Sequence, residues 1–394
     1  MSPGVVLPGG SRRPAGSLLE QPLQAPPVQW RGVQQGSPTD PPVLREWLVI
    51  SRNLAEAEQQ RRALQPYQLS ILRRQQLPHL QRVISVYRIA PERDLRQLER
   101  DVRQAFPDWQ QELNQRYLPL EQAVSEDEAA VRQWGQVSMG RLHPAPATCG
   151  RGLTLALLDG PVNQRLAEFA GADLSYRSLL PPSFSTPSAA AARHGTSLAV
   201  LLLGRHQIAG LLPGVRLHAL GIFAEDASAG LHTRSDWVIQ ALDHLAGVQP
   251  PVQVVNLSFG GAYSLLLEQF FAQLAQRMQF VAAAGNDGRE GLRYPAAYPS
   301  VLAVGAVDAA HRRLRQSNWG AQLALVAPGE DIWTLDEGGQ GYYASGTSFA
   351  APFVSAALAL YGSPKALQEQ ALNLGPPGRD AEYGAGLAQL PDCP

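Results

Sequence analysis

From Gly152 onward, short apolar runs alternate with stretches of helical periodicity, and this alternation is the feature that most restricts the fold. Helical patterns occur at Ser235–Ala246 and Leu265–Arg277. The apolar runs are Leu153–Leu158, Leu217–Phe223, Val252–Leu257, Phe280–Ala284, Val301–Val307 and Leu323–Ala327. Uninterrupted apolar strands that alternate with helices are typical of a parallel sheet covered on both faces. We therefore predict an α/β fold with its functional groups where strands end and helices begin.

The composition limits the kinds of partner that the chain can attract. Its 394 residues carry 33 Lys and Arg against 34 Asp and Glu, so the formal net charge is -1. This balance argues against a general attraction to nucleic acid or to an anionic membrane. No apolar run is long enough to cross a bilayer. The first residues, Met1–Arg13, lack the apolar core of a secretory signal, so the compartment stays undecided.

Before this region, the character of the chain changes twice. Residues 1–42 are rich in Pro, Gly, Gln and Ser and are predicted to be disordered. Residues 43–120 alternate strand and helix patterns, which predicts a small α+β domain. Its expected elements are a strand at Glu46–Ile50, a helix from Leu54 to Ala63 capped by Asn53, a strand at Arg82–Arg88, a helix from Leu95 to Phe106 and a strand at Glu112–Leu118. Residues 121–148 are interpreted as a linker and residues 149–394 as the second domain.

Three segments of the second domain place a chemically useful side chain at the end of a strand or helix. Asp159 follows the apolar strand Leu155–Leu158. His194 opens an apolar helix. Ser348 lies at the start of a buried helix, and we place Pro352 in the first turn of that helix. Each residue alone has an ordinary structural explanation, but their order along the chain is one of the three known for a catalytic serine triad.

The chemistry of peptide hydrolysis needs these three side-chain types together. A serine hydroxyl is too weak an acid to attack an amide unaided. Histidine accepts the proton of the hydroxyl near neutral pH and later returns it to the leaving amine. A buried carboxylate holds the imidazole in the correct tautomer and stabilises the imidazolium. The sequence therefore contains the set of groups that acyl transfer through a serine requires.

These residues and their motifs resemble the subtilisin family of serine peptidases (subtilases) over about Gly152–Tyr361. The block Gly-Thr-Ser-x-Ala-x-Pro around Ser348 is the most specific part of the likeness. The resemblance implies a subtilisin-like, mainly parallel sheet with helices on both faces. It also assigns Asp159 as the orienting acid, His194 as the general base and Ser348 as the nucleophile.

Two further blocks correspond to substrate contacts in subtilases. The asparagine of Ala283–Gly288 donates to the oxyanion in that family, so the resemblance gives this role to Asn286, beside the backbone N–H of Ser348. The block Val255–Gly261 is similar to the strand that pairs with the substrate backbone. The substrate-binding residues that the resemblance implies are Ser258, Phe259, Gly260, Ala283, Ala284 and Gly285.

Residues 43–120 are similar to a subtilase prodomain, whose fold is ferredoxin-like, mainly because of their position before the catalytic domain. The resemblance implies a precursor in which this domain assists folding and then inhibits, with Tyr117–Leu120 lying in the cleft like a product. An unrelated binding domain and a domain that is never released are the alternatives. The resemblance further implies a monomer that acts on protein or peptide substrates, needs no cofactor and works outside the cytoplasm. Structural calcium is common in subtilases, but the sequence has no acidic ligand loop for it.

Three positions depart from the family pattern, and the short stretch between Asn286 and Tyr294 carries Arg289 and Arg293. Gly160 follows Asp159 where subtilases usually have Ser or Thr, and Pro161 stands where they have Gly, so a hydroxyl partner of the carboxylate is expected to be missing. Ser197 stands where histidine is common. Arg293 either points into the pocket for the residue before the cut and favours acidic residues there, or points outward without effect.

Two questions have more than one answer at the level of sequence. Cys149 and Cys393 lie near the two ends of the second domain, and both a disulfide and two free thiols are consistent with their positions. For the function, a serine endopeptidase is the main expectation. A catalytically silent peptide-binding scaffold, and an esterase or acyl transferase that uses the same serine, are the alternatives.

Overall fold

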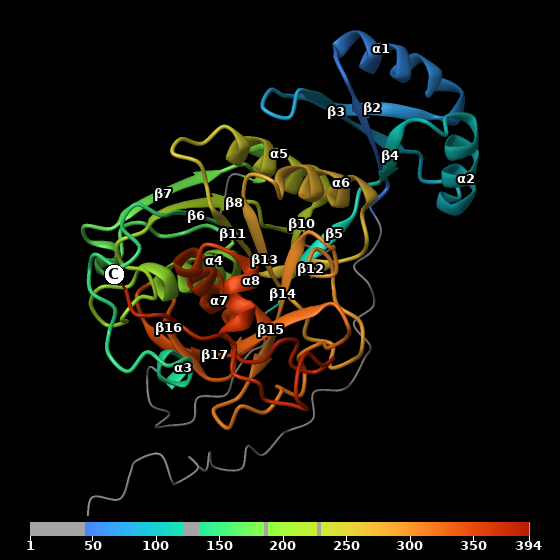
Figure 1. The fold of residues 1–394 in the computed structure, drawn as a ribbon. Coiled ribbons are helices and arrows are strands. Elements are labelled where there is room, and N and C mark those ends of the chain that lie inside the picture. Colours follow the sequence, from blue (N-terminus) through green and yellow to red (C-terminus); the bar gives the residue numbers. More distant parts are fainter. Residues whose placement is uncertain (1–43, 121–133, 185–187, 227–229, 394) are drawn as a thin grey trace, which may run out of the picture. The chain divides into compact units, whose positions relative to one another are not determined.

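The main body of the molecule is a seven-stranded parallel sheet (Figure 1). The computed structural model describes residues 44–120, 134–184, 188–226 and 230–393. The strand order is β15-β14-β13-β11-β6-β8-β7, and each neighbouring pair is parallel. The strands are β6 (Thr154–Asp159), β7 (Asp173–Ser178), β8 (Arg216–Gly221), β11 (Val254–Leu257), β13 (Gln279–Ala283), β14 (Val301–Val307) and β15 (Leu323–Pro328). Six of them were predicted as apolar runs, and only the half-exposed edge strand β7 was missed.

Helices cover the two faces of this sheet. In Figure 1, α5 and α6 lie on one side of the strands, and α4 and α7 lie on the other. The helices are α4 (Ala189–Leu203), α5 (Ser235–Ala246), α6 (Leu265–Leu274), α7 (Thr347–Tyr361) and α8 (Pro364–Glu369). A two-stranded sheet is formed by β16 (Ile332–Leu335) and β17 (Gly341–Ala344), and α3 (Trp134–Ser138) precedes β6. The predicted α/β fold is confirmed.

The N-terminal domain is a four-stranded antiparallel sheet with two helices. Its order is β2-β3-β1-β4, which is the ferredoxin-like arrangement that the resemblance implied. The elements are β1 (Glu46–Ser51), α1 (Leu54–Ala63), β2 (Leu69–Leu77), β3 (Arg82–Ile89), α2 (Leu95–Ala105) and β4 (Gln110–Leu113). Strand β2 was missed because its largely polar sequence lies at the sheet edge, exposed along much of its length.

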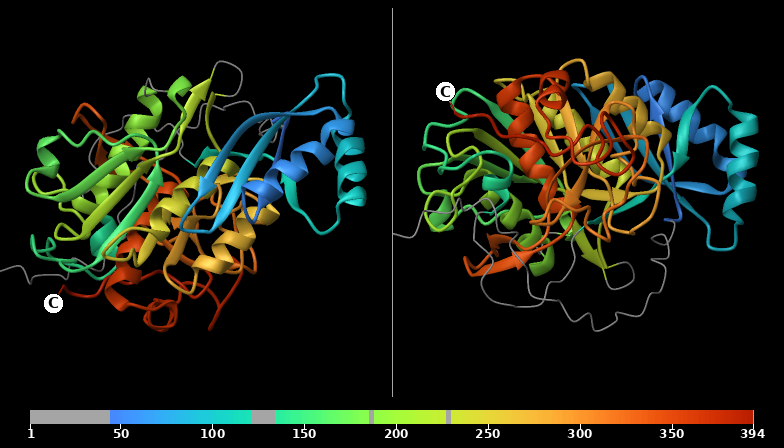
Figure 2. Two further views of the ribbon diagram at one scale, coloured as in Figure 1. Left: turned by 90° about the horizontal axis from the view of Figure 1, so that it is seen from above. Right: turned by 60° about the horizontal axis from the view of Figure 1, so that its bottom comes forward.

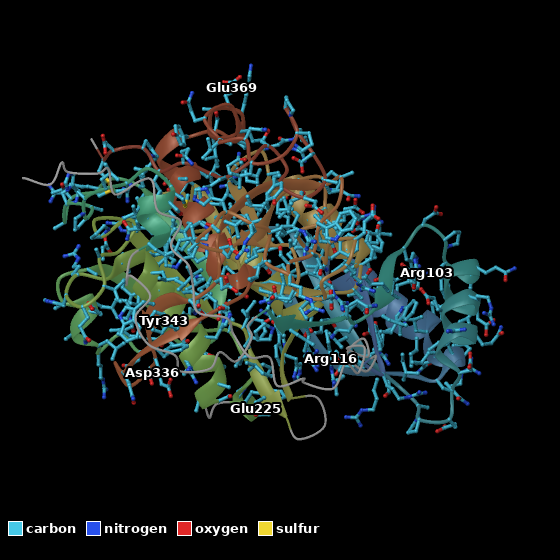
Figure 3. All side chains as sticks on the ribbon, turned by 90° about the horizontal axis from the view of Figure 1, so that it is seen from below. Arg103, Arg116, Glu225, Asp336, Tyr343 and Glu369 are labelled. Atoms are coloured by element: carbon cyan, nitrogen blue, oxygen red, sulfur yellow. A yellow bond between two sulfur atoms is a disulfide. The ribbon has the colours of Figure 1, made fainter. Side chains whose placement is uncertain are left out.

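The single strand predicted at Glu112–Leu118 is wrong. The structure has two strands there, β4 (Gln110–Leu113) and β5 (Arg116–Pro119). Strand β5 leaves the small sheet and lies between β12 (Phe259–Gly261) and β10 (Gly230–Arg234), and β10 also pairs with β9 (Ala224–Asp226). Arg116, labelled in Figure 3, is the first residue of β5. The chain therefore passes from one sheet into another within a few residues.

The central strand β1 contributes side chains both to the core of the N-terminal domain and to the core of the large domain. Side chains alternate between the two faces of a strand. Trp47 and Val49 lie in the small core formed with the domain's own helices. Leu48 and Ile50 point the other way and belong to the same apolar cluster as the core of the large domain. Figure 2 shows the strands of the N-terminal domain beside α5 and α6.

Cys149 and Cys393 form a disulfide that joins positions 244 residues apart in the sequence. This answers the question that the sequence left open. The bond ties the segment that enters the parallel sheet to the end of the chain. None of the helices in the described part of the chain combines the length and the apolar character that a membrane span needs.

Candidate active site

The structure pairs Asp159 with His194 at the carboxyl end of the parallel sheet. Asp159 is the last residue of β6, and its Oδ1 lies 2.7 Å from Nδ1 of His194. Both side chains are 1% exposed. The prediction that His194 opens its helix is wrong: α4 begins at Ala189 and is capped by the hydroxyl of Ser188. The histidine therefore lies in the second turn, where the helix itself fixes its position.

The carboxylate of Asp159 has one well-bonded oxygen and one buried oxygen without a partner. Oδ1 also accepts a hydrogen bond from the N–H of Gly160 over 2.7 Å. Oδ2 is buried and has no hydrogen-bond partner among the described residues, which agrees with the expected loss of a hydroxyl next to it. A Cβ atom on Gly160 would lie 2.0 Å from the carbonyl oxygen of Ala191. The close approach of α4 thus excludes the Ser or Thr that is usual in subtilases.

Ser348 lies in the first turn of α7, and its hydroxyl donates to the carbonyl oxygen of Ser258 over 2.9 Å. Pro352 is not in that first turn, contrary to the prediction, but in the helix interior. Proline has no N–H, so the carbonyl of Ser348 lacks its helical donor. The hydroxyl of Ser258 supplies one, over 2.8 Å. The ring of His194 lies 5.8 Å from that of Phe349, which brings the histidine beside the start of α7.

Two N–H donors converge on the carbonyl oxygen of Leu120. The side-chain amide of Asn286 donates to it over 2.7 Å and the backbone N–H of Ser348 over 3.4 Å. The Oδ1 atom of Asn286 accepts from the backbone N–H (3.0 Å) and the hydroxyl (2.9 Å) of Thr347. These bonds turn the Nδ2 group toward Leu120. Thr347 was missed from sequence, although it directly precedes Ser348 in the recognised motif.

Strand β5 occupies the cleft beside these donors. In β12, Phe259 pairs with Pro119, Gly260 with Leu118 and Gly261 with Tyr117, all antiparallel. The N–H of Leu120 donates to the carbonyl of Ser258 over 3.4 Å. Residues 117–120 thus run through the site as an added strand.

Strand β5 also pairs along its other edge, with β10, and its Tyr117 side chain is buried. Thr233 of β10 pairs with Tyr117 and Arg234 with Arg116. The Tyr117 side chain is completely buried and meets the ring of Phe259 edge-on, with centroids 6.0 Å apart. The site therefore holds the segment through both backbone edges and through a deeply inserted aromatic side chain.

Ala283, Ala284 and Gly285 lead from the end of β13 to Asn286, and Arg293 is attached to them. Its N–H donates to the Ala284 carbonyl over 2.9 Å. Its guanidinium group binds both carboxylate oxygens of Asp287, each over 2.7 Å. Both side chains are about nine-tenths buried, at 11% and 10% exposure. This is neither of the two arrangements expected for Arg293, because the arginine is enclosed and already paired.

Asp287 is held by more than Arg293. Its N–H donates to Oδ1 of Asn318, and Nδ2 of Asn318 donates back to the carboxylate over 2.9 Å. Burial by itself would raise the pKa of Asp287, but the hydrogen bonds from Arg293 and Asn318 outweigh burial and lower it. These hydrogen bonds therefore hold the carboxylate of Asp287 in position and favour its ionised form. No local pattern in the sequence signals this pair.

A second group of contacts joins the N-terminal domain to α6. The carboxylate of Glu112 accepts from the hydroxyl of Ser264 and from the N–H groups of Leu265 (2.8 Å) and Leu266 (3.4 Å). The first N–H groups of an α-helix have no acceptor within the helix, and here Glu112 accepts two of them. Burial raises the pKa of Glu112 to about 7, although the bonds from Ser264 and the helix oppose that shift.

Charged side chains extend this interface. Arg73 of β2 binds Glu46 (3.0 Å) and Asp236 of α5. Arg234 binds Glu46 over 3.1 Å. Asn114 donates to both carboxylates, over 2.9 and 2.8 Å. The carboxylates are therefore shared between the two domains.

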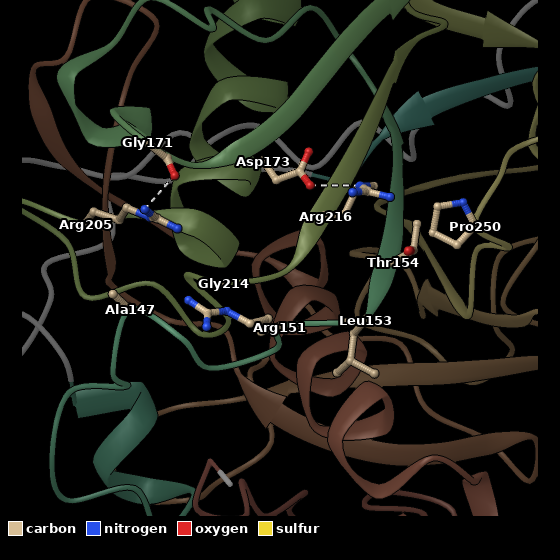
Figure 4. A pocket seen from close by; sticks show the side chains of 11 residues that line it. Ala147, Arg151, Leu153, Thr154, Gly171, Asp173, Arg205, Gly214, Arg216 and Pro250 are labelled. Carbon is tan, nitrogen blue, oxygen red and sulfur yellow. Dashed lines mark hydrogen bonds and ion pairs between the residues drawn. The ribbon is translucent and has the colours of Figure 1, made fainter.

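A cavity lies at the amino end of β6 (Figure 4), at the opposite end of that strand from Asp159. It measures about 410 Å³ and carries three arginines. Arg205 is bonded to the carbonyls of Gly171 and Pro213, and Arg216 to Asp173. These bonds hold neighbouring loops together. Within the described residues, no three His, Cys, Asp or Glu side chains gather to hold a metal ion.

Comparison with known proteins indicates the family of the chain. A model of the subtilase family matches residues 150–379. Subtilisin of Bacillus pumilus is 30% identical over 237 residues, which are 57% of this chain and 82% of that protein. The major intracellular serine protease of Bacillus subtilis is 33% identical over 180 residues, which are 43% of this chain and 55% of that protein.

Solved structures show the same fold. The structure of the prenylagaramide maturation protease PagA has a TM-score of 0.53 and 29% identity, over 61% of this chain and 92% of that one. Fervidolysin from Fervidobacterium pennivorans has a TM-score of 0.66 over 91% of this chain and 61% of that one; at 20% identity this likeness shows the fold alone. With the family model matching more than half of its length, the chain belongs to the subtilase family of serine peptidases.

Proposed function

We propose that this chain is the self-inhibited precursor of a serine endopeptidase that first cuts its own backbone after Leu120. The observation that carries the proposal is the environment of the Leu120 carbonyl, which accepts hydrogen bonds from both Asn286 and the N–H of Ser348. These are the donors that an oxyanion needs. The Leu120 carbonyl lies at the end of a strand that is paired along the cleft. The peptide bond that follows Leu120 is therefore positioned to be cut.

The proposed reaction uses the residues in the order that the chemistry requires. The hydroxyl of Ser348 turns from the Ser258 carbonyl to His194, gives its proton to Nε2 and attacks the Leu120 carbonyl carbon. Asp159 stabilises the resulting imidazolium through Nδ1. His194 then protonates the leaving amine of residue 121. A water molecule gives its proton to His194 and hydrolyses the acyl-enzyme, which restores the serine hydroxyl and leaves a new carboxylate on Leu120.

The same contacts account for inhibition. After the cut, residues 116–120 keep their backbone pairing with β10 and β12, and the buried Tyr117 anchors them. The N-terminal domain adds its apolar face and the Glu112 contact with α6. A strand linked to a docked domain competes with substrate at high effective concentration. The buried Tyr117 also predicts that substrates with an aromatic residue four positions before the cut bind best.

The test compares the wild-type chain with Ser348→Ala, expressed at full length. We expect the wild type to release a fragment that begins at Glu121, identified by N-terminal sequencing, and Ser348→Ala to stay intact. Ser345→Ala is the matched control, since this nearby hydroxyl bonds the N–H of Asp331 instead, and it should be cut like the wild type. A fluorophosphonate probe should label the wild type and not Ser348→Ala. An unlabelled, uncut wild type would support the peptide-binding scaffold instead.

The reaction products distinguish acyl transfer from hydrolysis. With an added amine nucleophile, an acyl transferase accumulates the amide of the new carboxyl terminus, whereas a peptidase releases mainly the free acid. We expect the free acid. The disulfide between Cys149 and Cys393 supports a place of action outside the reducing cytoplasm.

A further inference from the structure

The cavity at the amino end of β6 is lined by segments that lead into neighbouring strands of the parallel sheet. They precede or begin β6, β7 and β8, and Pro250 lies before β11. The volume of about 410 Å³ falls within the range of small-molecule sites, roughly 300–1,000 Å³. The charged residues of the lining are Arg151, Arg205, Arg216 and Asp173. With three arginines against one aspartate, the lining has an excess of two positive charges.

The positive charge of Arg205 is held in place by neutral acceptors. Its guanidinium group donates to the carbonyl oxygens of Gly171 (2.7 Å) and Pro213 (3.1 Å). Glu168 accepts the backbone N–H groups of residues 205–208 instead. No carboxylate in the part of the chain that the structure describes forms an ion pair with the Arg205 side chain. The guanidinium group is therefore positioned by the fold, and its charge is available to a ligand.

Two other side chains of the lining have polar groups to offer. Arg151 is exposed, and its guanidinium group has no hydrogen bond or ion pair with any described residue. Thr154 is only 1% exposed, and its backbone binds Gln253 on both sides. Its hydroxyl has no partner among the described residues, although buried hydroxyls usually have one. In the view of Figure 4, Arg151 and Arg205 extend into the cavity from opposite sides.

Asp173 supplies the negative charge of the lining and binds Arg216 over 2.8 Å. Their side chains are 55% and 41% exposed, so water weakens the pair. A guanidinium group has five N–H donors, and Asp173 engages one of those of Arg216. Arg216 can therefore bind a second anion without giving up Asp173.

These donors suit a small tetrahedral dianion. Guanidinium groups form short, charge-assisted hydrogen bonds with phosphate and with carboxylate oxygens. A carboxylate, however, accepts within one plane, whereas the arginines and the Thr154 hydroxyl come from different segments of the chain. A phosphate group has oxygens on all sides and carries a charge of about −1.5 to −2 near neutral pH. Its charge thus balances the excess of two positive charges in the lining.

We propose that this cavity is a binding site for a phosphate group, either as the free ion or as part of a small phosphate ester. A bound phosphate would join the segments before β6 and β8, and so stabilise the catalytic domain by mass action. The cavity lies at the opposite end of β6 from Asp159. The inference therefore does not rest on the proposed peptidase activity.

The test measures binding to the full-length Ser348→Ala chain by isothermal titration calorimetry at low ionic strength. The probes are inorganic phosphate, glycerol 3-phosphate and the dicarboxylate malonate. Arg151→Gln removes a positive charge that makes no bond within the described residues, and Asp173→Asn removes the negative charge of the lining. Arg315→Gln is the matched control, because Arg315 is also exposed and its guanidinium group likewise has no partner in the described part of the chain.

We expect one phosphate to bind per chain, saturably and with a Kd at or below about 1 mM. Arg151→Gln should weaken binding by about fivefold or more. Asp173→Asn should strengthen it by about threefold, and Arg315→Gln should change it by less than about twofold. Phosphate should also raise the midpoint of thermal unfolding more in the parent than in Arg151→Gln, since the general salt effect of phosphate is common to both chains.

The comparison of the two phosphates identifies the source of the group, because the free ion or the ester binds more tightly. The inference is overturned if binding does not saturate by about 10 mM phosphate, or if Arg151→Gln and Arg315→Gln bind phosphate equally well. Tighter binding of malonate than of either phosphate would reject phosphate as the ligand. Because Ser348→Ala prevents cleavage in these assays, phosphate binding can fail while self-cleavage of the wild type stands, and the reverse.

Discussion

Ser258 and Ser348 hold each other through two hydrogen bonds, in which each hydroxyl donates to the other residue's backbone carbonyl, over 2.8 and 2.9 Å. The Ser258 hydroxyl donates to the Ser348 carbonyl in place of the backbone N–H that Pro352 lacks. The other bond holds the Ser348 hydroxyl in a defined position before reaction. A proline inside α7 is therefore compatible with a well-ordered nucleophile.

Ser258→Ala removes the donor to the Ser348 carbonyl and also an acceptor for Asn256. We expect a loss of about 1–3 kcal/mol in stability, because buried polar groups are left unpaired, together with slower self-cleavage. Ser355→Ala is the control, since it loses a buried bond to Asn256 without touching Ser348. Thermal unfolding and the cleavage rate separate the two effects. Equal cleavage rates in the two variants would show that Ser258 has only a structural role.

Asn286→Ala should lower the rate of self-cleavage by about 10²–10³, the range known for loss of one oxyanion donor. That range was measured on a subtilisin, so its size is borrowed from another member of the same family. Thr347→Val keeps the shape of the side chain and one bond to Asn286 but removes the other, so we expect a smaller loss, about tenfold. Single-turnover rates at equal folded fraction provide the measurement. A larger loss for Thr347→Val than for Asn286→Ala would contradict the assignment of the donor.

The docking of the N-terminal domain on α6 should depend on pH through Glu112. Its pKa rises from 4.5 to about 7 in the docked state, mainly through burial. The docked domain thus binds the proton more tightly than the free domain. This contribution to docking is complete below pH 4.5 and is lost as the pH rises to about 7. Arg103, which lowers the pKa of Glu112, limits the effect.

Hydrogen exchange at Leu265 and Leu266 tests this in the Ser348→Ala chain between about pH 4.5 and 8. We expect protection, corrected for intrinsic exchange, to fall by about tenfold or more across this range. Glu112→Gln should flatten the profile, and Glu92→Gln, at an exposed position of the same domain, should not. A profile that keeps its slope in Glu112→Gln would assign the pH dependence to another group.

Cys393→Ser should lower the stability of the catalytic domain by about 2–5 kcal/mol, since the disulfide closes a very long loop. Urea denaturation of the oxidised wild type, the reduced wild type and the variant gives the comparison. Reduction should bring the wild type to the level of the variant and leave the variant unchanged. If the variant and the oxidised wild type unfold at the same urea concentration, the bond is not a stabilising element.

The sequence by itself was enough to predict the parallel sheet and to single out three candidate residues for a catalytic triad. Apolar runs such as Val301–Val307 report their burial directly, because a strand covered on both faces has no polar side. Asp159, His194 and Ser348 were recognisable because serine catalysis tolerates few other residue types, and each is part of a short local motif.

Only the tertiary structure decided how the rest of the chain serves this site. The end of β5 lies in the cleft because Leu120 meets Asn286, 166 residues further on. The contact of Glu112 with α6 and the disulfide likewise join segments that are far apart in the chain. Strand β2 was missed for another reason, its largely polar sequence at the sheet edge. The break between β4 and β5 escaped prediction because β5 pairs with β10 and β12, which are distant in the chain, whereas periodicity and motifs report only what a residue's near neighbours require.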